Sequence, residues 1–165
     1  MVKQILLPIL AVVAFIIIVG VFTQKSGFLN LKSLSVTQPT PTPMKTLTIG
    51  SKTITVQVAD TEAKRQQGLS GISSLDASSG MLFIFDTKGV VTTFWMKGML
   101  IPLDMIWIAN GKIIRIDKNI PVPSPNTPDN NLKRYSAGKP IDYVLEVNAG
   151  FSDKNNIKVG DSVGI

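Results

Sequence analysis

An apolar run without a single charge, from Ile5 to Phe22, is the first pattern along the chain. Leu, Ile, Val and Phe fill most of its positions, and a helix of this length spans about 27 Å, close to the ~30 Å hydrocarbon core of a bilayer. A cleaved signal peptide would have a shorter apolar region and a small-x-small cleavage site, which the residues after Gly20 do not form. The pattern predicts an uncleaved transmembrane anchor at 5–22 after a short tail at 1–4, with cleavage as the alternative.

A tract rich in threonine and proline follows this run. Proline occupies every second position from Pro39 to Pro43, which excludes a helix and a sheet ladder. We therefore expect residues 23–43 to be an extended linker that holds the rest of the chain away from the bilayer. Basic residues flank both ends of the span, so charge alone hardly orients it, and the default topology places the C-terminal part outside the cytoplasm.

From residue 44 onward the pattern changes to short alternating runs, which are typical of half-buried β-strands. Residues 47–58 contain two such runs around Gly50-Ser51, a pair that favours a hairpin turn. Residues 60–68 combine a capping residue, good helix formers and a final glycine, and predict a short helix. Further strands are predicted at 81–85, 92–97, 143–147 and 157–165.

The clearest hairpin joins residues 103–109 to 112–117 through Asn110-Gly111, the preferred pair for a type I′ turn. A two-residue turn fixes the register, and it places Ile106 opposite Arg115 and Asp104 opposite Asp117. Asp104 and Arg115 would then be diagonal neighbours on one face, close enough for an ion pair.

These elements predict a fold for residues 44–165. They are mostly strands, joined by turns and by one long proline-rich segment from Pro121 to Pro140, which is too long for a simple connector. We predict a small, mainly antiparallel β domain, a barrel or a sandwich, with one or two short helices and a single transmembrane helix before it.

The amino-acid composition excludes several kinds of reactive site. The chain has no cysteine and no histidine, which excludes disulfides, thiolate nucleophiles, imidazole catalysis and Cys/His zinc sites. The net charge is +6, but Lys3, Lys25 and Lys32 precede residue 44, which leaves 14 of the 17 basic residues against 11 acidic ones. We expect no nucleic-acid partner, because no basic stripe is present, and we expect no metal and no cofactor.

Two charges, Lys97 and Asp104, interrupt an apolar run that holds both tryptophans. One interpretation is a pocket floored by Trp95, where Lys97 binds an anion and Asp104 orients a hydroxyl or amine. The alternative is that Asp104 pairs with Arg115 while Lys97 extends its charge to solvent.

Glu146 is the other carboxylate in an apolar strand. It is either a general base with a raised pKa or the partner of Arg65 or Lys97 across the sheet. Arg65 is an exposed helical residue unless its helix packs over the sheet, where it could clamp a carboxylate.

Several motifs together resemble the domain-of-unknown-function family 192 over about residues 46–165. The resemblance implies a compact, mostly β fold, often exported behind a signal or anchor, and no established reaction. The chain departs from the family at Gly98-Met99, where Asn-Thr usually follows the lysine, and at Ser70, where Met is common. The motifs that carry the resemblance are Gln67-Gly68-Leu69, Gly80–Phe85, Phe94-Trp95-Met96-Lys97, Ile101-Pro102-Leu103-Asp104, Tyr143–Val147, Ala149-Gly150 and Gly160-Asp161.

Two functional hypotheses follow. The first is a membrane-tethered extracytoplasmic domain that binds a small anionic or polar ligand, or a partner in the cell envelope. The second is a hydrolase or lyase that uses Asp104 or Glu146 as acid–base group and Lys97 or Arg65 as anion clamp. Without an activated nucleophile in the sequence, the first is favoured. The candidate site residues are Arg65, Trp95, Lys97, Asp104 and Glu146.

Overall fold

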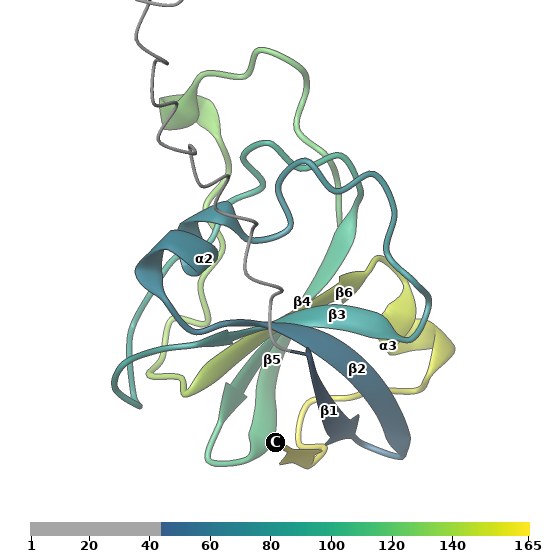
Figure 1. Cartoon of the computed structure of the whole chain (residues 1–165). Coiled ribbons are helices and arrows are strands. Elements are labelled where there is room, and N and C mark those ends of the chain that lie inside the picture. Colours follow the sequence, from purple (N-terminus) through teal and green to yellow (C-terminus); the bar gives the residue numbers. More distant parts are fainter. Residues whose placement is uncertain (1–43) are drawn as a thin grey trace, which may run out of the picture. The chain divides into compact units, whose positions relative to one another are not determined.

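The computed structural model describes residues 44–165 (Figure 1). The predicted anchor at 5–22 and linker at 23–43 lie outside the described residues. In the described part, none of the helices has the length and apolar character needed to cross a membrane. The elements are β1 (Met44–Ile49), β2 (Lys52–Ala59), α2 (Glu62–Gln67), β3 (Ser79–Ile84), β4 (Leu103–Ala109), β5 (Lys112–Ile120), the 3-10 turn η1 (Asp129–Asn131), β6 (Tyr143–Asn148), α3 (Phe151–Lys154) and β7 (Val163–Gly164).

The strands form one curled sheet in the order β5-β4-β6-β3-β2-β1-β7. All neighbours are antiparallel except β2 and β3, which run parallel because α2 lies in the connection between them. A single bridge between Lys112 and Ser162 brings the two ends of the sheet together, so the barrel is nearly closed. The prediction of a mainly antiparallel β fold is confirmed, in its barrel form.

The predicted first hairpin and short helix are both present. Gly50 takes the left-handed conformation that the turn between β1 and β2 requires, with φ of 57°. The Thr61 hydroxyl caps α2 by accepting a hydrogen bond from the Lys64 amide at 3.3 Å. Gly68 ends the helix, and its amide donates to the Lys64 carbonyl.

The predicted Asn110-Gly111 turn is also present, with positive φ at both residues. Ile108 pairs with Ile113 as the turn geometry predicts, but a bulge on β5 makes the next pair Trp107 with Arg115. The predicted pairing of Ile106 with Arg115 is therefore wrong. An inserted residue moves every later side chain of one strand relative to its partner, and the turn sequence carries no sign of it.

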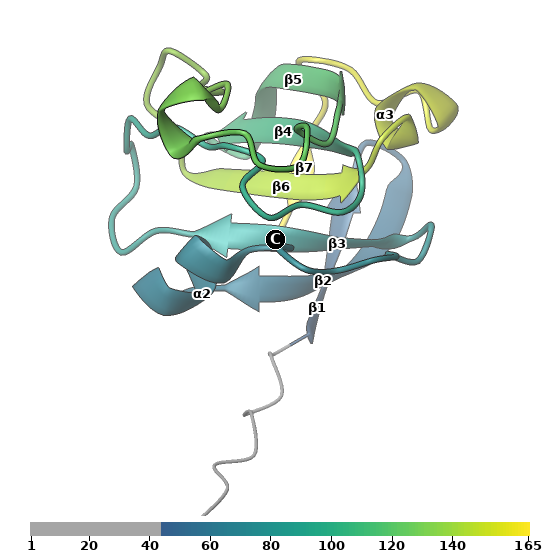
Figure 2. The same ribbon diagram turned by 90° about the horizontal axis from the view of Figure 1, so that it is seen from above.

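Both faces of the sheet are buried, unlike those of a simple amphipathic sheet. The inner face contributes a cluster with members from all seven strands, including Leu82, Ile106 and Leu145. The outer face of β3, β4 and β6 contributes a second cluster, with Met105 and Trp107. α2 and the long loops cover this outer face (Figures 1 and 2). All but one residue of β4 are buried for this reason.

One predicted strand is wrong, and another is shorter than predicted. Residues 92–97 belong to a loop over the outer face, held by single bridges from Val90 to Ile141 and from Phe94 to Tyr135. The last predicted strand, 157–165 with a break at Gly160-Asp161, is reduced to β7, which follows that break. A loop segment that packs on a sheet has the same alternation of apolar side chains as a strand of the sheet, because both bury every second side chain. The sequence pattern therefore does not distinguish the two.

Candidate functional site

Glu146 lies in the middle of β6, between β3 and β4. Its cross-strand neighbours are Met81 and Met105, and its side chain faces outward because Leu145 and Val147 belong to the inner cluster. The loops and α2 cover it so closely that it is only 4% exposed. A carboxyl group is thus placed between two thioether side chains beneath an apolar cover.

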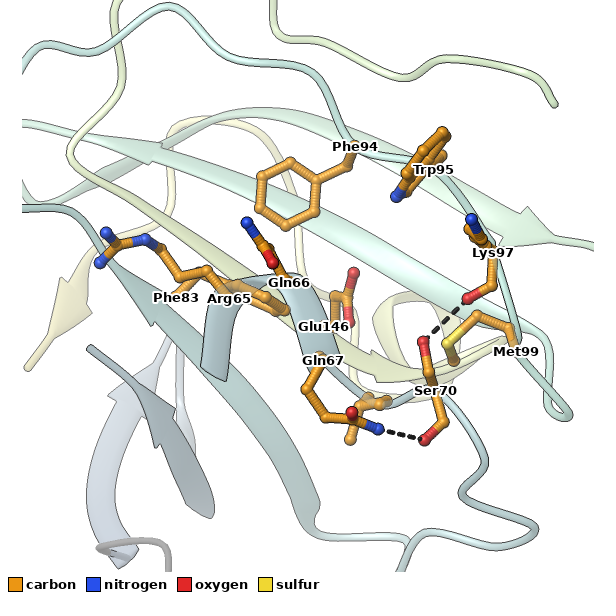
Figure 3. A pocket seen from close by; sticks show the side chains of 12 residues that line it. Arg65, Gln66, Gln67, Ser70, Phe83, Phe94, Trp95, Lys97, Met99 and Glu146 are labelled. Carbon is orange, nitrogen blue, oxygen red and sulfur yellow. Dashed lines mark hydrogen bonds between the residues drawn. The ribbon is translucent and has the colours of Figure 1, made fainter. Parts of the chain in front are cut away.

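A cavity of about 40 Å³ lies above this carboxyl (Figure 3). It adjoins a wider surface groove of about 490 Å³, which shares Gln66, Gln67, Ser70, Trp95 and Lys97 with it. Arg65, Trp95, Lys97 and Glu146, four of the five predicted site residues, line the cavity. The other cavity-lining residues are Gly68, Leu69, Phe83, Phe94 and Met99.

The side-chain oxygens of Glu146 make no hydrogen bond or ion pair with any residue of the described part of the chain. Burial raises the pKa of its carboxyl to about 8, because the ionised form would lose its hydration there. The group is therefore mostly protonated at neutral pH. The prediction that Glu146 pairs with Arg65 or Lys97 is wrong, and its role as a general base stays a prediction.

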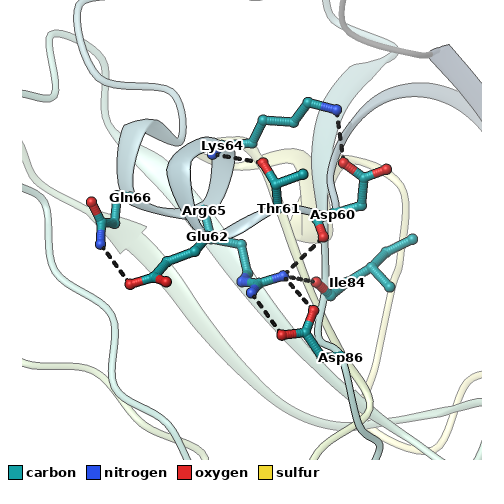
Figure 4. Close-up of polar contacts among 8 residues, drawn as sticks. All are labelled: Asp60, Thr61, Glu62, Lys64, Arg65, Gln66, Ile84 and Asp86. Carbon is teal, nitrogen blue, oxygen red and sulfur yellow. Dashed lines mark hydrogen bonds and ion pairs between the residues drawn. The ribbon is translucent and has the colours of Figure 1, made fainter.

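Arg65 is occupied on the far side of α2. Its guanidinium donates to the Ile84 carbonyl at 2.8 Å and to the Asp60 carbonyl at 3.1 Å, and it pairs with Asp86 at 3.4 Å (Figure 4). Figure 3 shows this head group pointing away from Glu146. Arg65 thus ties α2 to the loop after β3, and its stem, not its charge, contributes to the cavity.

Lys97 and Trp95 stand at the mouth of the groove. The Lys97 ammonium forms an ion pair with Asp129, the first residue of η1, and the Lys97 side chain is 53% exposed. The guanidinium of Arg134 lies 3.7 Å from the centre of the Trp95 ring, and the Lys97 nitrogen lies 5.4 Å from it. The Arg134–Trp95 contact and the Lys97–Asp129 ion pair join the proline-rich loop to the 94–99 segment.

Asp104 belongs to the other face of the sheet and does not reach this cavity. It is fully buried, and its two oxygens accept hydrogen bonds from the amides of Asn119 at 2.8 Å, Ser152 at 2.9 Å and Gly150 at 3.1 Å. The expected pair with Arg115 is wrong, because the β5 bulge turns Arg115 toward Asp117. Asp104 joins the end of β5 to α3, and it shares no pocket with Lys97.

Ser70 and Gly98, two of the three positions where the chain departs from the family pattern, lie next to each other. A Cβ on Gly98 would lie 3.3 Å from the Ser70 Cβ, and Gly98 has φ of 68°. The Ser70 hydroxyl donates to the Lys97 carbonyl at 2.8 Å. Two small residues therefore leave the groove open at this point, a role that their separation in sequence conceals.

Gln66, Gln67, Phe94 and Met99 also line the cavity and were not among the predicted site residues. Two features of the sequence could have pointed to these residues. Gln66 and Gln67 stand immediately before the glycine that ends the helix, and Phe94 begins the Phe-Trp-Met-Lys motif. Nothing in the pattern showed that the two segments meet above Glu146.

Two solved structures share this fold. One is a protein from Sinorhizobium meliloti 1021 with the provisional name of a transcription regulator, with 27% identity, a TM-score of 0.68, and coverage of 76% of this chain and 96% of that one. The other, of unknown function, is from Novosphingobium aromaticivorans DSM 12444, with 27% identity, a TM-score of 0.64, and coverage of 74% and 85%. No curated protein matches the chain.

A family model matches residues 45–165, almost the whole of the described part. Its description is DUF192, Uncharacterized ACR. The match includes both segments that meet above Glu146 and the strand that carries it, so the cavity lies wholly within the family domain. By this match the chain belongs to the domain-of-unknown-function family 192.

Proposed function

We propose that residues 44–165 form a module that binds a small polar ligand in the Glu146 cavity, outside the cytoplasm, on a chain tethered to the membrane through residues 5–22. The observation that carries the proposal is a buried carboxyl group that has no partner among residues 44–165 and faces a cavity that leads to a surface groove. Buried polar groups in proteins are nearly always paired, and the exceptions call for an explanation.

The energetics of this position support a ligand. Keeping a carboxyl group away from water destabilises the folded chain at neutral pH, because the unfolded chain releases its proton and the folded chain does not. A methionine, like the neighbours Met81 and Met105, would fill the position without that penalty. A ligand that pairs with Glu146 would offset it.

The tether is proposed from the sequence alone. The uncharged run from Ile5 to Phe22 is long enough to span the hydrocarbon core, and the proline-rich linker would hold the groove free of the bilayer surface. A partner protein of the cell envelope is the alternative occupant of the same groove.

A hydrolase or lyase is the second candidate, and the raised pKa of Glu146 favours it. A carboxyl with a pKa of about 8 can give up or accept a proton near neutral pH, as a general acid or base must. Asp104 no longer contributes, because its oxygens are bound to three backbone amides on the other face. This candidate therefore requires Glu146 to act with Lys97 or with groups of the substrate.

Fragment binding to the full chain tests the proposed ligand site. The probes are small amines, amides, alcohols and carboxylates, and the readout is the NMR signals of the Gln66 and Gln67 side-chain amides and of the Trp95 indole. We expect at least one class to shift these signals in the wild type and not in Glu146→Gln. Fragments that bind only elsewhere, or not at all to the folded chain, would overturn the proposal.

Protease treatment of intact cells tests the topology. The linker and the exposed loops of residues 44–165 should be cleaved from outside. Complete protection until the membrane is opened would place the domain in the cytoplasm and refute the proposed location.

A further inference from the structure

Three polar side chains around the Glu146 cavity, those of Gln66, Gln67 and Ser70, each donate one hydrogen bond to another part of the protein. The Gln66 side-chain nitrogen donates to the Glu62 carboxylate at 3.1 Å, and the Gln67 side-chain nitrogen donates to the Ser70 carbonyl at 3.1 Å. The Ser70 hydroxyl donates to the Lys97 carbonyl at 2.8 Å. Each glutamine thus keeps its side-chain oxygen and one N–H for a ligand, and the Ser70 hydroxyl keeps its lone pairs.

The Glu146 carboxyl adds two more oxygens at the floor. Within residues 44–165, no hydrogen bond reaches the side-chain oxygens of Gln66, Gln67 or Glu146. Carboxylate and amide oxygens together accept hydrogen bonds from a ligand with several N–H groups. A carboxylate is best paired with a positive charge. A primary ammonium group has a positive charge and three N–H donors.

The two cationic side chains that line the cavity do not compete for this place. Arg65 is held by Asp86 and the Ile84 carbonyl, and Lys97 is held by Asp129. No titratable side chain of β3 or β4 is directed at Glu146 from its cross-strand positions, which are both methionines. The carboxyl is thus the only acid among the residues that line the cavity.

The volume of the cavity and the side chains that line it limit the kinds of ligand that fit. A cavity of about 40 Å³ exceeds the space for one water and suits an ammonium on a single carbon better than a broad guanidinium. The aromatic rings of Phe83 and Phe94 are among the walls, and aromatic rings attract cations.

We infer that the ligand is a small molecule with a primary ammonium group, which enters the cavity and pairs with Glu146 while the rest of the molecule lies in the groove beside Trp95 and Ser70. This inference rests on the proposed ligand site and names the chemistry of its occupant.

Binding of such a ligand releases a proton. The carboxyl, with a pKa of about 8, gives its proton to solvent, and the ammonium keeps its own, so the bound state is an ammonium–carboxylate pair. Affinity should therefore rise as the pH increases from 6 to 8 and then level off. A neutral ligand that accepts a hydrogen bond from the protonated carboxyl would show the opposite trend.

n-Butylammonium chloride and 1-butanol are the matched probes, because they differ mainly in charge and in the number of donors. Isothermal titration calorimetry and the NMR signals of Gln66 and Gln67 in the full chain, at constant ionic strength, measure their binding. We expect n-butylammonium to bind about tenfold or more tightly than 1-butanol. Glu146→Gln should remove that preference, and Asp76→Asn, which removes an exposed acid, should keep it.

The outcomes separate this inference from the proposed function. Equal binding of the two probes, undiminished n-butylammonium binding in Glu146→Gln, or binding only of amides or acids at the same signals would overturn the ammonium inference and leave a ligand site standing. No perturbation of these signals by any probe or fragment, with the chain folded, would overturn both.

Discussion

Replacing Glu146 by glutamine should change how the stability of the protein depends on pH. Glutamine keeps the shape of the side chain and cannot ionise. In the wild type, burial raises the pKa of Glu146 from the usual 4.5 to about 8. Between these two values the folded chain holds a proton that the unfolded chain has released, so the wild type loses stability as the pH rises.

The size of the effect follows from the shift. Each pKa unit corresponds to about 1.4 kcal/mol, and the shift from 4.5 to about 8 therefore amounts to about 5 kcal/mol in total. The free energy of unfolding of the wild type, relative to Glu146→Gln, should fall by this order between pH 4.5 and pH 8 and stay constant above it. Such a loss is a large part of the 5–15 kcal/mol that typically stabilises a domain.

Urea unfolding at several values between pH 4.5 and pH 9 measures this difference. Tryptophan fluorescence of the full chain reports on the described domain, because both tryptophans, Trp95 and Trp107, lie in it. All other titrating groups are common to the two proteins and cancel in the difference. Asp76→Asn serves as the control and should run parallel to the wild type.

Parallel curves for wild type and Glu146→Gln would refute the reasoning. They would mean that Glu146 reaches water or finds a partner in solution, and the ligand site would lose its main support. A ligand with a primary ammonium should flatten the wild-type curve, because it stabilises the ionised carboxyl.

Three further substitutions test the structure around the site. Asp104→Asn should lower the free energy of unfolding by about 3–5 kcal/mol, because an amide cannot accept three backbone hydrogen bonds; an unchanged thermal midpoint would show that these bonds contribute little. Gly80→Ala should cost about 1–3 kcal/mol in urea unfolding, since the new methyl group would lie 2.6 Å from the Glu146 carbonyl; full stability would show that the strands separate easily. Ser70→Met should weaken n-butylammonium binding in calorimetry without lowering the unfolding midpoint, and unaltered affinity would place the ligand outside the groove.

Local structure was largely predictable from local residues. The hairpins at Gly50 and at Asn110-Gly111, the short helix capped by Thr61, and most strands follow from backbone preferences and alternation that act over a few residues. Glu146 was also identified from its local sequence, because it is an acidic residue within an otherwise apolar strand. Family membership was also predicted from motifs over about residues 46–165, and the family model matches residues 45–165.

The surroundings of Asp104 and Glu146, the two acids within apolar strands, depended on the tertiary structure. One bulge on β5 turned Arg115 away from Asp104, and β-strand alternation then placed Asp104 and Glu146 on opposite faces of the sheet. The residues that isolate Glu146 come from α2 and from the loop around Phe94, segments that are distant in sequence. The sequence by itself thus determined which side chains needed partners, whereas the packing of loops on the sheet decided which of them found one, because burial depends on the whole fold.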